Sequence, residues 1–175
     1  MSMWFANGAD YDDEIREKFL NLHNQVFNGQ LETWRNNSYS LLALIILLDQ
    51  FSRYICRNTA QAFAQDEKVV RIVKQGIETG WYQKLYFIQR KFFYMPLMQA
   101  ENIETQELSV TMFARLHDEV PDELKELFSK SLSFAESHYY VISKFGRFPE
   151  LNEILDRQSS PSEIEFLKRG KYRFL

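Results

Sequence analysis

An uninterrupted apolar run that ends against charged residues is the feature that most constrains how this chain folds. Residues 41–48, LLALIILL, are followed directly by Asp49, and Arg53 and Arg57 come four and eight residues later. Apolar residues recur at helical spacing beyond Asp49, and the stretch 40–55 is too long for an ordinary strand. The run is also far shorter than the about 20 apolar residues that cross a bilayer. We therefore expect one buried helix over residues 40–55.

Helical periodicity and short connections along the rest of the chain predict an all-α fold. Further helices are expected over residues 10–28, 59–80, 82–95, 104–117, 121–146 and 160–169. About seven or eight helices joined by short turns would pair antiparallel in a compact, tetratricopeptide-like array, as a single domain over residues 1–175. The residue pattern of a tetratricopeptide unit, which repeats at about 34 residues, cannot be recognised in the sequence.

Local signals predict where several helices begin and end. Asp10 could cap the first helix, and residues 58–61 resemble a capping box, with a polar cap and a glutamine following it. Pro96 is expected to stop the helix before it. Gly146 is expected to end a long helix in the left-handed conformation. Residues 160–163, SPSE, combine a cap, a first-turn proline and a capping glutamate, which makes them the clearest helix start in the chain.

Composition and charge narrow the class of protein. A net charge of −3, from 21 basic and 24 acidic residues, argues against a nucleic-acid binder that works by bulk electrostatics. The single cysteine, Cys56, cannot form an internal disulfide, and residues 1–14 lack a signal-peptide pattern, so a cytoplasmic protein is expected. We expect no metal and no cofactor, because no metal-binding motif or phosphate-binding glycine loop occurs. The absence of a nucleophile elbow also favours a protein that is not an enzyme.

Several longer stretches resemble a known bacterial family. These are LALIILLDQFSR at residues 42–53, TAQAFAQDEK at 59–68, HYYVISKFGRFPELNEILDR at 138–157 and PSEIEFL at 161–167. They are similar to the bacterial domain-of-unknown-function family nine-twenty-four, and the resemblance runs from Trp4-Phe5 to the end of the chain. It implies an all-α, tetratricopeptide-like fold and implies no reaction.

The chain departs from the pattern of that family at three places. Gln99-Ala100-Glu101 stands where the family usually reads His-Ser-Glu, and Pro149-Glu150-Leu151-Asn152 stands where it reads Pro-His-Arg-Asn. Asp156 replaces a glycine before Arg157. Two histidines and an arginine of the pattern are therefore missing, and a catalytic or metal site built from them in relatives would be lost here.

The charged residues at the end of the apolar run lead to the candidate site. A carboxylate at the end of a core helix needs a partner, since an unpaired buried charge is costly. Arg147, flanked by two phenylalanines, is the partner we expect for Asp49, because arginine binds a carboxylate through a planar fork. The candidate ligand-binding cluster comprises Asp49, Arg53, Arg57, Glu101, His138 and Arg147.

Two interpretations of this cluster remain open. It could be a structural network of ion pairs that fixes which helix packs against which. Alternatively, it could line a pocket whose arginines hold an anionic group, with His138 as a general base near neutral pH. The first interpretation is favoured, since structural networks commonly gather such groups, and we assign no catalytic residue.

The function expected from the sequence is a helical scaffold that binds a protein or a peptide. Residues 81–94, WYQKLYFIQRKFFY, carry aromatic side chains on more than one helix face, so part of this surface could meet a partner. The alternative is an enzyme or a small-ligand binder that holds an anionic group between Arg53, Arg147, Glu101 and His138. We expect neither a nucleic-acid nor a membrane partner, and the basic tail 168–174 is interpreted as a complement to a helix dipole.

Overall fold

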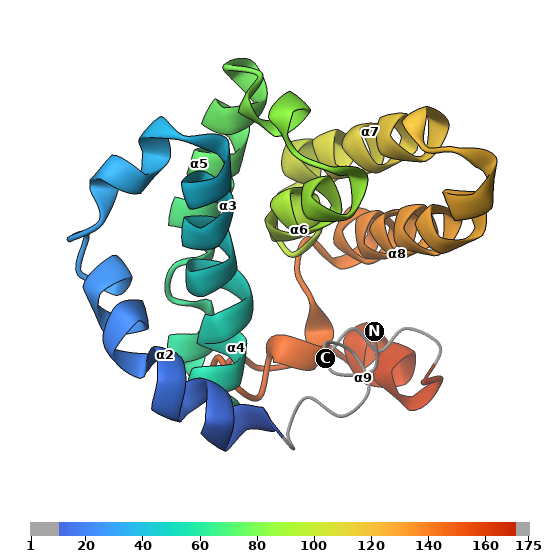
Figure 1. Cartoon of the computed structure of the whole chain (residues 1–175). Helices are drawn as coiled ribbons and strands as arrows, with labels where there is room; N and C mark the ends of the chain where they lie inside the picture. Colours follow the sequence, from blue (N-terminus) through green and yellow to red (C-terminus); the bar gives the residue numbers. More distant parts are fainter. Residues whose placement is uncertain (1–10, 171–175) are drawn as a thin grey trace. The chain divides into compact units, whose positions relative to one another are not determined.

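The computed structural model describes residues 11–170 and is all-helical over that range (Figure 1). The α-helices are α2 (Asp12–Phe27), α3 (Ser38–Ile46), α4 (Ser52–Ile55), α5 (Asp66–Glu78), α6 (Phe87–Met98), α7 (Ile103–Glu119), α8 (Asp122–Phe145) and α9 (Pro161–Lys168). The prediction of an all-α protein is confirmed for these residues. Asp10, the Trp4-Phe5 pair and the end of the basic tail lie outside the described residues.

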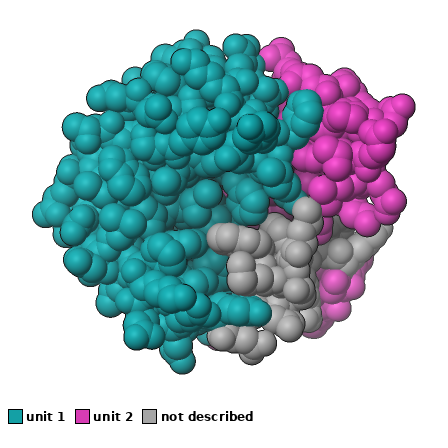
Figure 2. Space-filling view, in the orientation of Figure 1, with its two compact units in different colours: residues 1–96 teal, residues 97–175 magenta. Residues whose placement is uncertain are grey.

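The chain divides into two compact units, residues 1–96 and residues 97–175, which Figure 2 shows in different colours. Within the second unit, α7 and α8 form an antiparallel pair joined by a short turn at Val120-Pro121 (Figure 1). Such a pair is the element from which tetratricopeptide-like arrays are built. The array itself and the single domain remain predictions.

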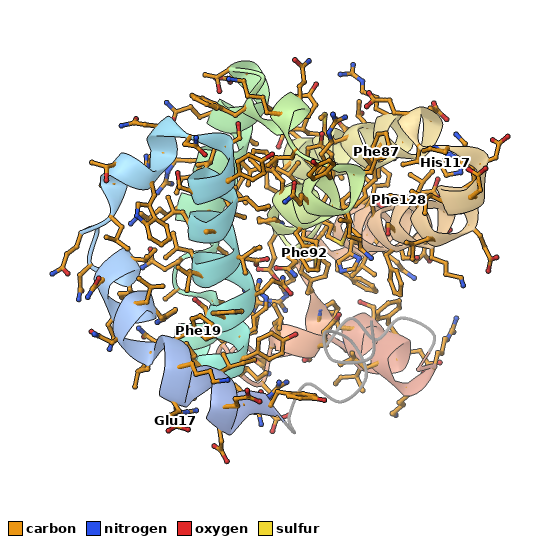
Figure 3. All side chains as sticks on the ribbon, viewed as in Figure 1. Glu17, Phe19, Phe87, Phe92, His117 and Phe128 are labelled. Atoms are coloured by element: carbon orange, nitrogen blue, oxygen red, sulfur yellow. The ribbon has the colours of Figure 1, made fainter. Side chains whose placement is uncertain are left out.

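The apolar run forms the core of the first unit. Leu41, Leu44, Ile45 and Leu48 are all buried, as the prediction for residues 40–55 requires. α2 packs against the same segment, and the rings of Phe19 and Phe51 lie 4.7 Å apart, with Phe19 directed toward α4 (Figure 3). Helix formation over the predicted range is confirmed.

The helix over residues 40–55 is not uniform. A π-helical turn, η3 (Leu47–Phe51), separates α3 from α4 and contains Asp49 and Gln50. A π turn changes the hydrogen-bonding step and leaves backbone carbonyls without their usual helical donors. The Ser52 hydroxyl donates to the carbonyl of Leu48 at 2.7 Å within this turn. Apolar periodicity alone does not reveal this turn.

The capping box expected at residues 58–61 is wrong. Asn58, the expected cap, has φ of 60°, in the left-handed conformation, and Thr59 instead precedes a short 3-10 helix, η4 (Ala60–Phe63), without a side-chain cap. The Thr59 hydroxyl donates instead to the carbonyl of Cys56 at 2.7 Å, so it closes the preceding turn. α5 begins later, at Asp66, where the acidic side chain complements the positive end of the helix dipole.

The stop expected at Pro96 is also wrong, because Pro96 lies inside α6, which continues to Met98. Proline removes its own N–H and crowds the carbonyl four residues earlier, which costs α6 one backbone bond near its end without stopping the helix. The expected helix start at Tyr82 is wrong as well. Residues Trp81–Lys84 form a 3-10 helix, η5, and α6 starts at Phe87.

α5 approaches α3 and α6 closely within the first unit because Gly76 has no side chain. A Cβ at this position would lie 2.6 Å from Cζ of Phe93 and 3.2 Å from Cδ2 of Leu41. Both contacts are too short for a real Cβ, so the packing of Phe93 against α5 requires glycine here.

Helix ends in the second unit follow the sequence signals closely. Gly146 ends α8 with φ of 69°, in the left-handed conformation that glycine adopts without strain. Ser160 and Glu163 form the predicted capping box at the start of α9. Phe128 is buried in the α7–α8 pair, whereas Leu124 is exposed at the start of α8. Figure 3 shows Phe128 between the two helices.

Among the described residues, no helix is both long enough and apolar enough to cross a membrane.

Candidate functional site: paired charges in each unit

Asp49 is buried in the π-helical turn and has its partners in the first unit. Its carboxylate accepts a hydrogen bond from the Gln50 amide at 2.5 Å and lies 3.3 Å from the guanidinium of Arg53. Asp49 is 2% exposed. Burial raises the pKa of this carboxyl, and Arg53 and Gln50 oppose the rise.

Arg53 joins α4 to the start of α5. Its Nη1 and Nη2 donate to the two carboxylate oxygens of Asp66 at 3.1 and 3.0 Å, in the planar fork that arginine favours. Nη1 also lies 3.3 Å from the carbonyl of Ala62, and the guanidinium stacks over the ring of Phe63. Asp66, which the sequence analysis did not single out, is therefore the main partner of Arg53.

Arg57 lies beyond the end of α4 and does not continue the line of Asp49 and Arg53. Its Nε and Nη2 donate to the two oxygens of Asp12 at the start of α2, at 2.5 and 2.7 Å. This exposed pair ties the first turn of α2 to the chain after α4. The helical spacing that aligned the three charged residues fails because α4 ends at Ile55.

A buried pair of polar side chains supports the π-helical turn from α2. Nε2 of His23 lies 2.8 Å from Oγ of Ser52. Because the single hydroxyl hydrogen of Ser52 is directed to the Leu48 carbonyl, Nε2–H donates to Oγ. Burial lowers the pKa of His23, with the Asn24 side chain opposing it. Serine and histidine here form a structural bridge, since both side chains are buried in the core.

Glu101 binds the loop after α8 to the start of α7. One carboxylate oxygen accepts the backbone N–H of Phe148 at 2.7 Å. Arg157 donates to both carboxylate oxygens, at 2.5 and 2.9 Å, and also to the carbonyl of Phe148 at 3.2 Å. Glu101 was a candidate ligand-binding residue, and Arg157 is its partner.

Arg147 has an equally complete set of partners in the second unit. Its Nε and Nη2 donate to the two oxygens of Glu163 at 2.7 and 2.9 Å, and Nη2 also donates to the carbonyl of Gln158. Glu163 in turn accepts the N–H of Ser160 as part of the capping box. Bonds from Arg147 and Ser160 lower the pKa of Glu163 to about 2.

His138 is buried on α8 and is a neutral core residue near pH 7. Its Nδ1–H donates to the carbonyl of Phe134 at 2.7 Å, and its ring meets that of Phe148 edge-on at 5.5 Å. Burial lowers the pKa of His138 to about 4, so the imidazole is uncharged at neutral pH, and its single N–H is the one that bonds to Phe134.

The candidate cluster is thus distributed over both units. Asp49, Arg53 and Arg57 belong to the first unit, and Glu101, His138 and Arg147 belong to the second. Each arginine of the cluster is engaged by a carboxylate of its own unit. The expected pairing of Asp49 with Arg147, and ligand binding by the cluster, remain predictions.

Glu150 is a polar group that sequence reasoning treated only as a departure from a family pattern. Both of its carboxylate oxygens are buried, and no other residue donates a hydrogen bond to them. Burial raises the pKa of this carboxyl, and the charge of Glu101 adds to the rise. The sequence showed only that an acid stands here in place of the histidine of the family pattern. The burial of the Glu150 carboxylate oxygens could be learned only from the structure.

The segment between α5 and α6 presents apolar side chains to solvent. Tyr86 is 74% exposed and Ile88 is 40% exposed. The adjacent ammonium group of Lys84 lies 4.8 Å from the ring centre of Trp81. We call these four residues, together with Arg90, the η5–α6 surface. At the other end of α6, Phe93 and Tyr94 are buried, so the aromatic-rich segment is only partly covered.

Within residues 11–170, no group of three or more His, Cys, Asp or Glu side chains gathers in a way that could hold a metal ion.

The helices define the class as an all-α protein over residues 11–170, and comparisons give the family. Residues 1–171 match the family described as a bacterial protein of unknown function, DUF924, so the chain belongs to that family. A solved structure of a protein of unknown function from Agrobacterium tumefaciens is similar, with a TM-score of 0.82 and 32% sequence identity. The match covers 95% of this chain and 89% of that one. No match was found among the curated proteins.

Proposed function

We propose that this protein is a helical module that binds a protein or peptide segment. The observation that carries the proposal is the pairing of its arginines. Arg53, Arg57 and Arg147 each meet a carboxylate of the chain, and all three contacts are forks that use both carboxylate oxygens within 3.1 Å. An incoming anion would have to displace these carboxylates, so a pocket for an anionic substrate has less support.

The exposed aromatic surface supports the same proposal. Protein interfaces are enriched in aromatic residues and arginine, and large exposed side chains in a rigid setting lose little conformational entropy on binding. The η5–α6 surface has this composition, whereas the charged groups of the candidate cluster form internal contacts. The function is therefore assigned to the surface rather than to the cluster.

A small-ligand binder is the second candidate, and Glu150 is the observation that favours it. A buried carboxylate that no other residue meets with a hydrogen-bond donor loses its hydration with little compensation, at a cost on the order of several kcal/mol if it stays ionised. A ligand with an amino group would supply the missing donors. Under this alternative the ligand is cationic, in contrast to the anionic group expected from the sequence.

A peptide-selection experiment tests the proposal. A phage-displayed library of random peptides is panned against the full-length protein, and enriched peptides are synthesised and titrated by fluorescence anisotropy. We expect enriched peptides that bind with a dissociation constant of about 1–100 μM, the range of a transient interaction. Failure to enrich any peptide would contradict the proposed function.

Native mass spectrometry separates the two candidates. The protein is purified from its host without denaturation and its intact mass is measured. A bound peptide or protein supports the binding module. A bound small amine that is lost in Glu150→Gln would support the ligand-binding candidate instead.

A further inference from the structure

We propose that the η5–α6 surface docks an acidic peptide segment that carries apolar side chains. This inference rests on the proposed function and specifies both the site and the chemistry of the partner. The surface comprises Trp81, Lys84, Tyr86, Ile88 and Arg90, and it lies where the chain passes from the end of α5 into α6 (Figure 1).

Exposure of large apolar side chains is the first observation. Tyr86 is the most exposed of the large hydrophobic residues of the described chain, and Ile88 lies two residues after it. Large apolar side chains that are exposed near one another in the chain can mark an interaction site. The two side chains can supply the apolar anchors of a small interface.

The backbone beneath these side chains is held firmly. Arg90 donates from Nε to the carbonyl of Leu85 and from Nη2 to the carbonyl of Gln83, both at 2.9 Å. The backbone N–H of Tyr86 donates to the Gln89 side chain, also at 2.9 Å. These bonds fix the turn between η5 and α6, so a partner meets a surface that needs little ordering on binding.

The charge of the segment indicates the partner. Residues 79–96 contain Lys84, Arg90 and Lys91 but no aspartate or glutamate, in a chain whose net charge is −3. The nearest acid in sequence is Glu78, in the last turn of α5. Cations also lie over the rings, because Lys84 stacks on Trp81 and the guanidinium of Arg90 lies 5.5 Å from the ring centre of Phe87. Acidic side chains between apolar ones complement this arrangement.

A peptide fits these observations better than a polyanion. Membrane recognition by charge uses clusters of about four to eight basic residues, and nucleic-acid binding draws on many phosphate contacts. The η5–α6 surface has few cations, and its largest exposed side chains are apolar. Aromatic anchors with a small number of charges are the pattern of protein interfaces.

The test uses a labelled twelve-residue peptide of glutamate alternating with leucine and phenylalanine. A second peptide replaces each glutamate by glutamine, and a third replaces each apolar residue by alanine. We expect the acidic apolar peptide to bind the full-length protein in fluorescence anisotropy and the other two to bind at least about tenfold more weakly.

Surface variants locate the site. Tyr86→Ser and Ile88→Ala are each expected to weaken binding by about tenfold or more. Serine is chosen at position 86 because it is suited to a helix cap. Lys84→Glu is expected to weaken binding by several-fold. Tyr39→Ala is the matched control, because Tyr39 is also an exposed tyrosine of the first unit, and it should leave the dissociation constant within about twofold. Circular dichroism and urea midpoints check that every variant is folded.

The outcomes distinguish the inference from the proposed function. Peptides from the random library that bind equally well to the surface variants, or that are neutral or basic, would overturn the docking site and leave the proposed function standing. No binding of any peptide would overturn both. Binding of phosphatidylserine vesicles or single-stranded RNA that depends on Tyr86 and Lys84, without binding of the acidic peptide, would overturn the assignment of the partner.

Discussion

Arg147 and Glu163 form a fork in which two guanidinium nitrogens meet both carboxylate oxygens, at 2.7 and 2.9 Å. The pair joins the chain just after α8 to the first turn of α9. Glu163 also accepts the N–H of Ser160, so one carboxylate receives the arginine and completes a helix cap. The contact shows how the charged residues of this protein are used, namely to fix chain segments rather than to present free groups.

Replacing His138 should remove a component of the pH dependence of stability. The pKa of His138 is lowered in the folded protein from 6.5 to about 4, so the unfolded chain binds the proton more readily between these values. The stability that the folded protein has because His138 stays neutral is fully present above pH 6.5. It is lost as the pH falls toward 4, and the total loss in the free energy of unfolding is about 3 kcal/mol.

Urea unfolding at a series of pH values measures this effect. We expect His138→Gln to flatten the fall in stability between pH 6.5 and 4 relative to the parent. His117→Gln is the control, because His117 lies near the α7–α8 turn and is only half-buried (Figure 3). An unchanged slope in His138→Gln would contradict the assignment of a neutral, buried histidine.

Removing the Ser52 hydroxyl should destabilise the first unit. The hydroxyl donates to the Leu48 carbonyl in the π-helical turn and accepts from His23, so Ser52→Ala removes a donor to that carbonyl and the partner of the buried His23 Nε2–H. The expected loss is about 1–3 kcal/mol in the free energy of unfolding. Ser143→Ala removes an exposed hydroxyl that bonds the carbonyl of Tyr140, and it should cost less than about 0.5 kcal/mol.

Glycine at position 156 should stabilise the protein. Asp156 has φ of 52°, in the left-handed region, where an L-residue is strained by roughly 1 kcal/mol. Asp156→Gly relieves this strain, and we expect a gain of about 0.5–1 kcal/mol in thermal or urea unfolding. Glu107→Gly, in the interior of α7, should lose about 1 kcal/mol. A loss in Asp156→Gly would contradict the strain.

Asp156 also shows where the family resemblance was informative. The sequence pattern has glycine at this position, and the structure supplies the reason, because the backbone is left-handed there. The departure is therefore a local strain rather than a lost functional group. Glu150 illustrates the opposite case, since the replacement of a histidine by an acid in a buried position could not be interpreted from the sequence.

Local chemistry determined which helix ends could be predicted. Ser160 and Gly146 act through bonds within a few residues, so their roles were legible in the sequence. The cap expected at Asn58 was wrong because the backbone there is left-handed, with φ of 60°, and the short helix begins only after Thr59. The partners of Arg53 and Arg57 depend on segments brought together by packing, which no spacing within one helix reveals.

Replacing Arg147 by alanine tests the central claim, that the charged cluster is structural. The substitution leaves the Glu163 carboxylate, which is only 4% exposed, without its arginine. Arg169→Ala is the matched control, because Arg169 pairs with Glu165 at the exposed end of α9. The measurement is the urea midpoint of both variants and the parent, with the slope checked for a single transition. We predict a clearly lower midpoint for Arg147→Ala and no change for Arg169→Ala, whereas an Arg147→Ala protein as stable as the parent would contradict the account.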